Sequence, residues 1–474
     1  MELNELNILI IEDEPDFVEE IKRRVSSLCR EPVFTVAGYA EVAAEFLKND
    51  FFDLIFLDLK LPTANQSMDS DPQHGRDLLD LARAVAPGTP VFMLTGSSAE
   101  QFLPEMMALN HQIDVWGQGK TLSLIGFQPK HRVNNLDALI HPYIVACDAV
   151  CDVEINSSTE LDLRVARLVR IFTASVGGVF CDVRRIGGGL SGALVLKLLV
   201  RDGSGVKIHD SIAKIGSPDH IQDEVDRHDK YILRLEPSAT PRKVAVLNHG
   251  AKDTSGVFYS LASASEFTGF SIVEKGAGEV IKAVMGCVQR WTDAATQKRV
   301  SIQSIRRSFI SDEAFGEIRH LILHDWVERF EQNPVLVKWG CVHGDLHGMN
   351  VLLSDALVPI LIDYGDVEEG PLCRDPITFE LSTFFHPDGP FKNSEWPNEN
   401  EALLWGNAEF AAPNCPAEEF FNGCREWSET VAAGKRERAA VAYGYLVRQL
   451  KYSGCNALRV NQLLAGVKRL YDSA

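Results

Sequence analysis

The stretch CVHGDLHGMNVLLSD, residues 341–355, places two histidines, an aspartate and an asparagine directly before an apolar run. Asn350 follows Asp345 by five positions, a spacing that lets the aspartate accept a hydroxyl proton while the asparagine turns to a metal ion. Just beyond it, VPILIDYGD (358–366) is an apolar segment that leads into Asp363, a further oxygen ligand for a hard cation. The pattern predicts a polar hairpin at which metal and phosphate groups are bound.

The pattern H-G-D-x-H-x-x-N followed by I-D-Y resembles the aminoglycoside phosphotransferase and choline kinase-like family, which has a protein-kinase-like fold. The resemblance covers about 166–474 and implies an α+β bilobal domain, with an N-lobe at 166–265 and a C-lobe at 266–474. It implies Asp345 as the catalytic residue, with ATP as donor and a hydroxyl-bearing small molecule as acceptor.

Metal binding in this half follows from the same resemblance. It implies that Asn350 and Asp363 hold Mg²⁺, and that Asp375, in the segment Arg374-Asp375-Pro376, braces the catalytic loop. His343 and His347 have a spacing that suggests zinc, but two ligands alone do not make a zinc site.

A glycine-rich segment precedes the hairpin in VRRIGGGLSGALVLKLLV, residues 183–200. A Rossmann fold would place a helix after it, whereas ALVLKLLV is β-rich, so the sequence favours a strand–turn–strand. Such a loop either covers nucleotide phosphates or is a tight hairpin that uses glycine for positive φ. The candidate phosphate-binding residues are Gly187, Gly188, Gly189, Ser191 and Gly192.

A lysine and a glutamate support the nucleotide-binding interpretation. Lys214 ends the short apolar segment in DSIAKIGS, where a kinase-like third strand supplies its phosphate-binding lysine. The following helical pattern presents Glu224 for pairing with Lys214, and Asp223 and Asp226 are poorer candidates.

The same sequence pattern, an apolar strand that ends in polar residues, occurs three times in the amino-terminal part. NILIIEDEPDF (7–17), FDLIFLDLKLP (52–62) and TPVFMLTGSS (89–98) are apolar strands with polar residues at their carboxyl ends. Amphipathic helical segments alternate with them, so an α/β doubly wound, flavodoxin-like parallel sheet is expected over residues 1–125.

This part resembles a response-regulator receiver domain. The resemblance implies that Glu12, Asp13 and Asp58 hold Mg²⁺, that Asp58 accepts a phosphoryl group, and that Thr95 follows it as a switch. It also implies a phosphodonor partner, such as a sensor histidine kinase.

The receiver lysine is ambiguous in the sequence. Lys120, in IDVWGQGKT, is the favoured candidate, and Lys130, in GFQPKHRVNN, is the alternative. GQGKT is not a P-loop, because Asp114 occupies the position of its first glycine. Residues 126–165 are expected to form a linker with a connector helix, or to add the last receiver helix.

Composition excludes several classes of protein. The net charge of −19 disfavours a nucleic-acid partner. The ten cysteines show no CxxC pair, which is typical of reduced thiols in the cytoplasm, and no apolar run suits a membrane span. A homodimer is compatible with the sequence.

Together these features predict a receiver-regulated ATP-dependent phosphotransferase of a bacterial two-component-type signalling or defence pathway. A nucleotide-binding pseudokinase or signalling scaffold remains an alternative, as does a protein kinase or a nucleotidyltransferase on the same fold. Transfer of α-label or γ-label from ATP, and the molecule that receives it, separates these alternatives.

Overall fold

A computed structural model describes residues 5–30, 32–96, 111–188, 194–235, 237, 240–260, 265–273, 277–354, 356–411 and 414–474. The chain divides into two compact units. The first comprises Met1–Gln222 and Lys243–Leu261, and the second comprises Asp223–Arg242 and Ala262–Ala474.

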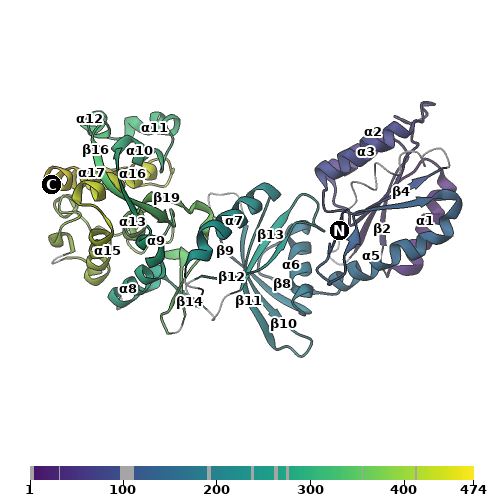
Figure 1. Cartoon of the computed structure of the whole chain (residues 1–474), viewed down its shortest axis with the longest axis horizontal. Helices are drawn as coiled ribbons and strands as arrows, with labels where there is room; N and C mark the ends of the chain where they lie inside the picture. Colours follow the sequence, from purple (N-terminus) through teal and green to yellow (C-terminus); the bar gives the residue numbers. More distant parts are fainter. Residues whose placement is uncertain are drawn as a thin grey trace. The chain divides into compact units, whose positions relative to one another are not determined.

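The first unit begins with a five-stranded parallel sheet in the order β2-β1-β3-β4-β7 (Figure 1). Its strands are β1 (Leu6–Ile11), β2 (Pro32–Ala37), β3 (Leu54–Asp58), β4 (Val91–Thr95) and β7 (Ile125–Pro129). Three of them, β1, β3 and β4, are buried along their whole length, as expected of parallel strands covered on both faces. This strand order confirms the doubly wound, flavodoxin-like prediction.

Helices cover both faces of this sheet. On one face lie α1 (Pro15–Leu28) and α5 (Leu136–Cys151), and on the other lie α2 (Ala40–Asn49) and α3 (Pro72–Val85). Alternate residues of each strand enter the two cores: Ile8 and Ile10 pack toward α1 and α5, whereas Leu9 packs toward α2 and α3. The site-bearing carboxyl ends are therefore held by two separate hydrophobic layers.

The fifth strand lies later in the chain than the sequence suggested. Residues 112–123 contain a two-stranded hairpin of β5 (Gln112–Ile113) and β6 (Leu122–Ser123), and β7 then completes the sheet. The sheet therefore passes the expected boundary at residue 125, and α5 is its last covering helix rather than a separate connector.

A six-stranded sheet completes the first unit, in the order β12-β13-β11-β10-β9-β8. Its strands are β8 (Glu154–Ser157), β9 (Phe180–Gly188), β10 (Leu194–Arg201), β11 (Lys207–Gly216), β12 (Arg242–Leu247) and β13 (Ser255–Ser260). Helix α6 (Leu163–Ser175) packs on it, with the ring of Phe172 stacked 4.3 Å from that of Phe258. Antiparallel pairing of β9 with β10 confirms the strand–turn–strand expected around the glycine-rich segment.

The second unit combines two small sheets with helices. The sheets are β14-β17-β18 and β15-β16-β19, formed by β14 (Ser265–Thr268), β15 (Thr296–Ser301), β16 (Pro334–Val342), β17 (Val351–Ser354), β18 (Pro359–Leu361) and β19 (Glu368–Pro371). Its main helices are α8 (Ala277–Cys287), α13 (Arg374–Phe385), α15 (Glu418–Val431), α16 (Lys435–Gln449) and α17 (Ala457–Asp472). Shorter helices are α9 (Gln289–Asp293), α10 (Ile302–Arg307), α11 (Asp312–Ile318), α12 (Val327–Glu331) and α14 (Glu399–Ala402). Helix α7 (Pro218–Tyr231) is divided between the two units. The small sheets and helices agree with the predicted kinase-like architecture.

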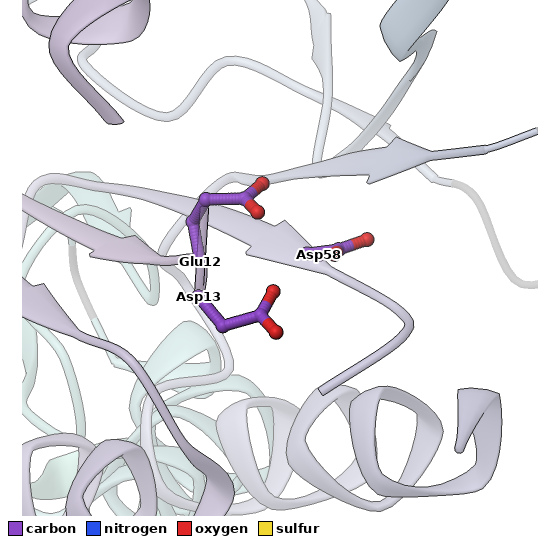
Figure 2. Close-up of side chains that lie close together, drawn as sticks. All are labelled: Glu12, Asp13 and Asp58. Carbon is purple, nitrogen blue, oxygen red and sulfur yellow. The ribbon is translucent and has the colours of Figure 1, made fainter. Parts of the chain in front are cut away.

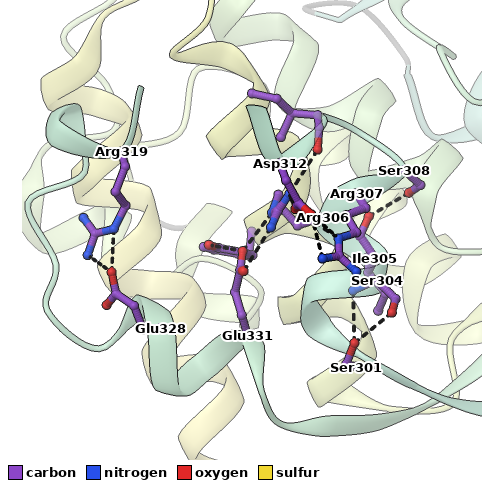
Figure 3. Close-up of polar contacts among 12 residues, drawn as sticks. Ser301, Ser304, Ile305, Arg306, Arg307, Ser308, Asp312, Arg319, Glu328 and Glu331 are labelled. Carbon is purple, nitrogen blue, oxygen red and sulfur yellow. Dashed lines mark hydrogen bonds and ion pairs between the residues drawn. The ribbon is translucent and has the colours of Figure 1, made fainter. Parts of the chain in front are cut away.

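A buried ion pair and a hydrogen bond to it join three helices of the second unit (Figure 3). Arg306 of α10 donates from Nε and Nη2 to the two carboxylate oxygens of Glu331 in α12, at 2.9 and 3.1 Å. The hydroxyl of Tyr443 in α16 donates to the same carboxylate at 2.9 Å. Because Glu331 is buried, removing Arg306 would leave an uncompensated carboxylate in the core, whereas Arg306 also donates to Asp312 at 2.7 Å.

None of the helices within the described ranges has the length and apolar character that crossing a lipid bilayer requires.

Candidate functional site

Three carboxylates gather at the carboxyl ends of β1 and β3 (Figure 2). Glu12 and Asp13 directly follow β1, and Asp58 is the last residue of β3. One oxygen of each lies within 4.8 Å of the others. The two strands are parallel neighbours, so their carboxyl ends meet at one edge of the sheet, as the sequence predicted.

Burial makes this cluster suited to a hard cation. Burial, and then repulsion from Asp58, raises the pKa of Glu12 to about 7, and burial likewise raises the pKa of Asp58. Within the described residues, the buried Glu12 Oε2 has no hydrogen-bond partner. A donor set of carboxylate oxygens with one unpaired buried oxygen fits Mg²⁺, which prefers oxygen ligands.

Lys130, and not Lys120, is the lysine of this cluster. Its Nζ lies 2.8 Å from Glu12 Oε1 and 3.0 Å from Asp58 Oδ2. Burial alone would lower the pKa of Lys130, but the hydrogen bond to Glu12 and the charge of Asp58 outweigh it, and the pKa is raised. Lys120 is exposed in the segment before β6, so the preference for Lys120 is corrected.

Thr95 lies at the same sheet edge. It ends β4, in which its neighbour Leu94 pairs with Asp58, and Thr95 itself pairs with Pro129, the residue before Lys130. Its hydroxyl is buried without a hydrogen-bond partner among the described residues. The strand register thus puts the hydroxyl-bearing and lysine-bearing strand ends side by side.

In the second unit, Asp375 organises the loop that contains Asp345. Its carboxylate accepts hydrogen bonds from the backbone N–H of His343 at 2.9 Å and of Gly344 at 3.0 Å. Arg374 Nε donates to the carbonyl of Gly344 at 3.0 Å. The N–H and the carbonyl of Gly344 are therefore both held by the first two residues of α13.

Gly344 has a conformation that other residues adopt only with strain. Its φ is +83°, and a Cβ at this position would lie 2.1 Å from the carbonyl oxygen of Asp366. The glycine thus permits a close approach between the loop that contains Asp345 and the segment that follows Asp363.

Asn350 connects Asp345 with the strand that leads to Asp363. Its Nδ2 donates to the carbonyl of Asp345 at 2.9 Å, and its own carbonyl accepts from Ile362 N–H at 3.0 Å. Asp363 follows immediately, with a left-handed φ of 61° that is uncommon for a non-glycine residue. Strained backbone of this kind clusters at functional sites, and here it directs the carboxylate expected to hold metal.

Arg448 and His347 contact the Asp345 carboxylate, and His386 lies next to His347. Arg448 Nη1 of α16 lies 3.5 Å from Oδ1, and His347 Nε2 lies 3.7 Å from Oδ2. The ring of His386 lies 4.5 Å from that of His347. Burial lowers the pKa of His347, and burial with repulsion from His347 lowers that of His386 to about 4, so both rings are neutral near pH 7.

The zinc alternative for His343 and His347 has no support. His343 Nε2 contacts the carbonyl of Ile362 at 3.0 Å, whereas His347 faces Asp345. Across the described ranges, the cluster formed by Glu12, Asp13 and Asp58 is the one group of three metal-ligating side chains.

The predicted nucleotide-binding residues are distributed over both units. Lys214 lies buried in β11 of the first unit, and Glu224 lies buried in the part of α7 assigned to the second. Gly187 and Gly188 end β9. Gly189, Ser191 and Gly192 lie outside the described residues. The roles of all seven remain predictions.

No protein-family model and no curated protein matches this chain. Among solved structures, a CheY-like response regulator receiver domain protein from Methanospirillum hungatei JF-1 is 19% identical, covers 30% of this chain and 95% of its own, and has a TM-score of 0.22. An aminoglycoside phosphotransferase from Alicyclobacillus acidocaldarius is 14% identical, with 61% and 92% covered and a TM-score of 0.32. The choline kinase LicA from Streptococcus pneumoniae is 13% identical, with 61% and 93% covered and a TM-score of 0.32. These are the two kinds of protein that the motifs resemble.

Proposed function

We propose that this chain is a receiver-regulated, ATP-dependent phosphotransferase that transfers the γ-phosphoryl group of ATP to a hydroxyl group of a small acceptor. The observation that carries the proposal is the bracing of the Asp345 loop by Asp375, together with the link through Asn350 to the backbone before Asp363. This arrangement fixes an acid-bearing loop beside two oxygen ligands, as phosphoryl transfer requires.

In the proposed reaction, Lys214 and the glycine-rich segment bind the nucleotide phosphates, and Asn350 and Asp363 hold Mg²⁺. When bound, Mg²⁺ offsets the negative charge of the phosphates. Asp345 orients the acceptor hydroxyl and accepts its proton. The acceptor oxygen then forms a bond to the γ-phosphorus, the bond from that phosphorus to the bridging oxygen breaks, and ADP leaves with the electron pair.

The receiver part is proposed to control this reaction through Asp58. A phosphodonor, such as a sensor histidine kinase, would phosphorylate Asp58 with Mg²⁺ held by Glu12, Asp13 and Asp58 itself. A phosphoryl group adds negative charge between Lys130 and the buried hydroxyl of Thr95, and both groups are able to bind it.

The test uses ATP labelled at the α or the γ position, a panel of hydroxyl compounds, and the full chain with or without D345N. We expect γ-label on an acceptor, a loss of at least hundredfold in D345N, and nucleotide binding retained in that variant. Transfer of α-label would instead indicate a nucleotidyltransferase, and label on protein would indicate a protein kinase. ATP binding without any transfer would contradict the proposal and favour a pseudokinase.

A further inference from the structure

Two thiols lie against a buried arginine, away from both sites described above. Cys147 and Cys151 are one helical turn apart at the end of α5. Nη1 of Arg167, in α6, lies 3.0 Å from Cys151 Sγ and 3.8 Å from Cys147 Sγ. Nη2 of the same guanidinium donates to Asp53 Oδ2 at 3.1 Å. The arginine thus has a carboxylate on one side and a pair of thiols on the other.

Cys151 is connected with solvent through a cavity of about 360 Å³. Cys29 and Cys151 both line this cavity, together with Leu6, Arg30, Asp148, Asp152, Val153 and Glu154. A cavity of this size admits peroxide and small electrophiles. Cys151 is 8% exposed, whereas Cys147 is fully buried behind it.

The pKa values of the two thiols are shifted in opposite directions. The hydrogen bond with Cys147, and then the charge of Arg167 acting against burial, lowers the pKa of Cys151 to about 7. The same hydrogen bond, together with burial, raises the pKa of Cys147 well above its usual value. The charged groups around the pair are Arg167, Arg170 and Asp53, and around the cavity Arg30, Asp148, Asp152 and Glu154. Near pH 7 a substantial fraction of Cys151 is therefore thiolate, whereas Cys147 stays a neutral thiol.

Cys29 provides a comparison inside the same cavity. Its exposed fraction is 8%, equal to that of Cys151. The Asp148 carboxylate lies 3.7 Å from Cys29 Sγ, where Cys151 has the guanidinium of Arg167. A nearby carboxylate repels a thiolate and a guanidinium stabilises it, so the two cysteines, at equal exposure, differ in the charged group that each contacts.

We propose that Cys151 is a peroxide-reactive thiol and that Cys147 resolves its oxidised form as a disulfide. The Cys151 thiolate attacks one oxygen of the peroxide, the O–O bond breaks, and with one proton taken up the products are a sulfenic acid and water. The Cys147 thiol then attacks the sulfenic sulfur, and a second water leaves as the S–S bond forms. Two electrons pass from the thiol pair to the peroxide.

The position of Cys151 favours the second step. Side chains four residues apart on a helix lie on one face, but a disulfide requires their Cβ atoms to approach to about 4 Å. Cys151 is the last residue of α5, so one terminal turn has to open rather than a helix interior. Formation of the disulfide also removes the Cys151 thiolate that contacts Arg167. Arg167 connects α6 with Asp53, the residue before β3 of the five-stranded sheet.

The first experiment is limited alkylation of the full chain with iodoacetamide at pH 7, read by peptide mass spectrometry. We expect Cys151 to be labelled at least tenfold faster than Cys29, with a rate that rises through pH 7. R167M should remove most of this difference between the two labelling rates. R167K keeps the positive charge, so it should retain the difference, and it serves as the second variant if R167M does not fold. Equal rates at Cys29 and Cys151 in the unmodified chain would overturn the proposal.

The second experiment treats the chain with hydrogen peroxide and maps disulfides by mass spectrometry. We expect a bond between Cys147 and Cys151, which dithiothreitol reverses. In C147S the sulfenic acid at Cys151 should persist and react with dimedone, and in C151S neither product should form. Absence of the disulfide from the peroxide-treated unmodified chain would contradict the proposal. Neither readout depends on phosphotransferase activity.

Discussion

The ammonium group of Lys130 lies 3.0 Å from Asp58 Oδ2, although 72 positions separate the two residues in the sequence. The same ammonium contacts Glu12 at 2.8 Å, so it joins the two buried carboxylates of the cluster. Phosphorylation of Asp58 would change the charge that Lys130 faces. Lys130 begins the short helical segment that leads into α5, so under the proposed regulation this segment would respond to the state of Asp58.

K130M should abolish the response of the chain to a small phosphodonor such as acetyl phosphate. The substitution removes the one cation within hydrogen-bond distance of Asp58 in the described residues and leaves Glu12 and Asp58 to repel each other. The measurement is ATP turnover with and without acetyl phosphate. K120M is the matched control, because Lys120 is exposed, and it should respond as the unmodified chain does. Loss of the response in K120M with retention in K130M would reverse the assignment.

G344A should destabilise the second unit by about 2 kcal/mol or more and abolish phosphoryl transfer. An alanine would be strained at φ +83°, and its Cβ would meet the carbonyl oxygen of Asp366. Chemical denaturation and transfer assays give the two readouts. G434A is the control, since Gly434 has no atom within 4 Å of an added Cβ and an extended φ of 164°. An active, stable G344A protein would show that the loop does not have this backbone.

R448M should lower kcat about tenfold with a smaller effect on nucleotide binding. Arg448 Nη1 contacts the Asp345 carboxylate, and the neutral side chain would no longer orient it. R448K should retain part of the rate because it keeps the charge. On the same helix, Arg436 is exposed and contacts the terminal residue Ala474, so R436M should leave kcat unchanged. Equal kcat in R448M and R436M would exclude a positioning role.

Stability of the second unit should fall as pH rises from about 4.5 to about 7, in part through Glu380. Burial raises the pKa of Glu380 from 4.5 to about 7, and Trp405 Nε1 donates to its carboxylate at 2.8 Å. In this window the folded state keeps a proton that the unfolded state has lost, so the contribution present below pH 4.5 is lost as pH approaches 7. E380Q should remove about 3 kcal/mol of this dependence.

The measurement is urea denaturation of the unmodified chain and E380Q between pH 4.5 and pH 8. E426Q, at an exposed position of α15, should follow the unmodified chain. Identical pH profiles for E380Q and the unmodified chain would show that Glu380 is ionised in the folded state throughout this range.

Most of the fold could be predicted because its signals are local. The apolar runs before Asp58 and Thr95 are short and bounded by polar residues, so the carboxyl ends of β3 and β4 follow from the sequence. The link between Asp345 and Asn350 likewise depends on a spacing of five residues, which the loop preserves. These features could therefore be predicted from the order of the residues alone.

Long-range partners could not be predicted in the same way. The hairpin of β5 and β6 displaces the fifth strand. Lys120, although somewhat far from Thr95, was therefore nearer to the usual spacing than Lys130, which follows the actual strand IGFQP. That short strand followed by a helix was the signal available for Lys130. Arg448 and Arg167 lie within amphipathic helices whose periodicity indicates packing, and nothing in that periodicity reveals Asp345 or Asp53 as their partners.

If Lys214 and Asp363 both act on one magnesium-bound nucleotide, as proposed, the effects of replacing them on nucleotide binding should be coupled, and a double-mutant cycle measures this coupling. Binding of Mg²⁺ with a non-hydrolysable ATP analogue would be measured by calorimetry for the unmodified chain, K214M, D363N and K214M/D363N. Each single substitution should weaken binding about tenfold or more, and the double substitution should weaken it clearly less than the product of the two effects. Effects that simply multiply, or a chain that binds the analogue equally well in all four forms, would contradict the proposal.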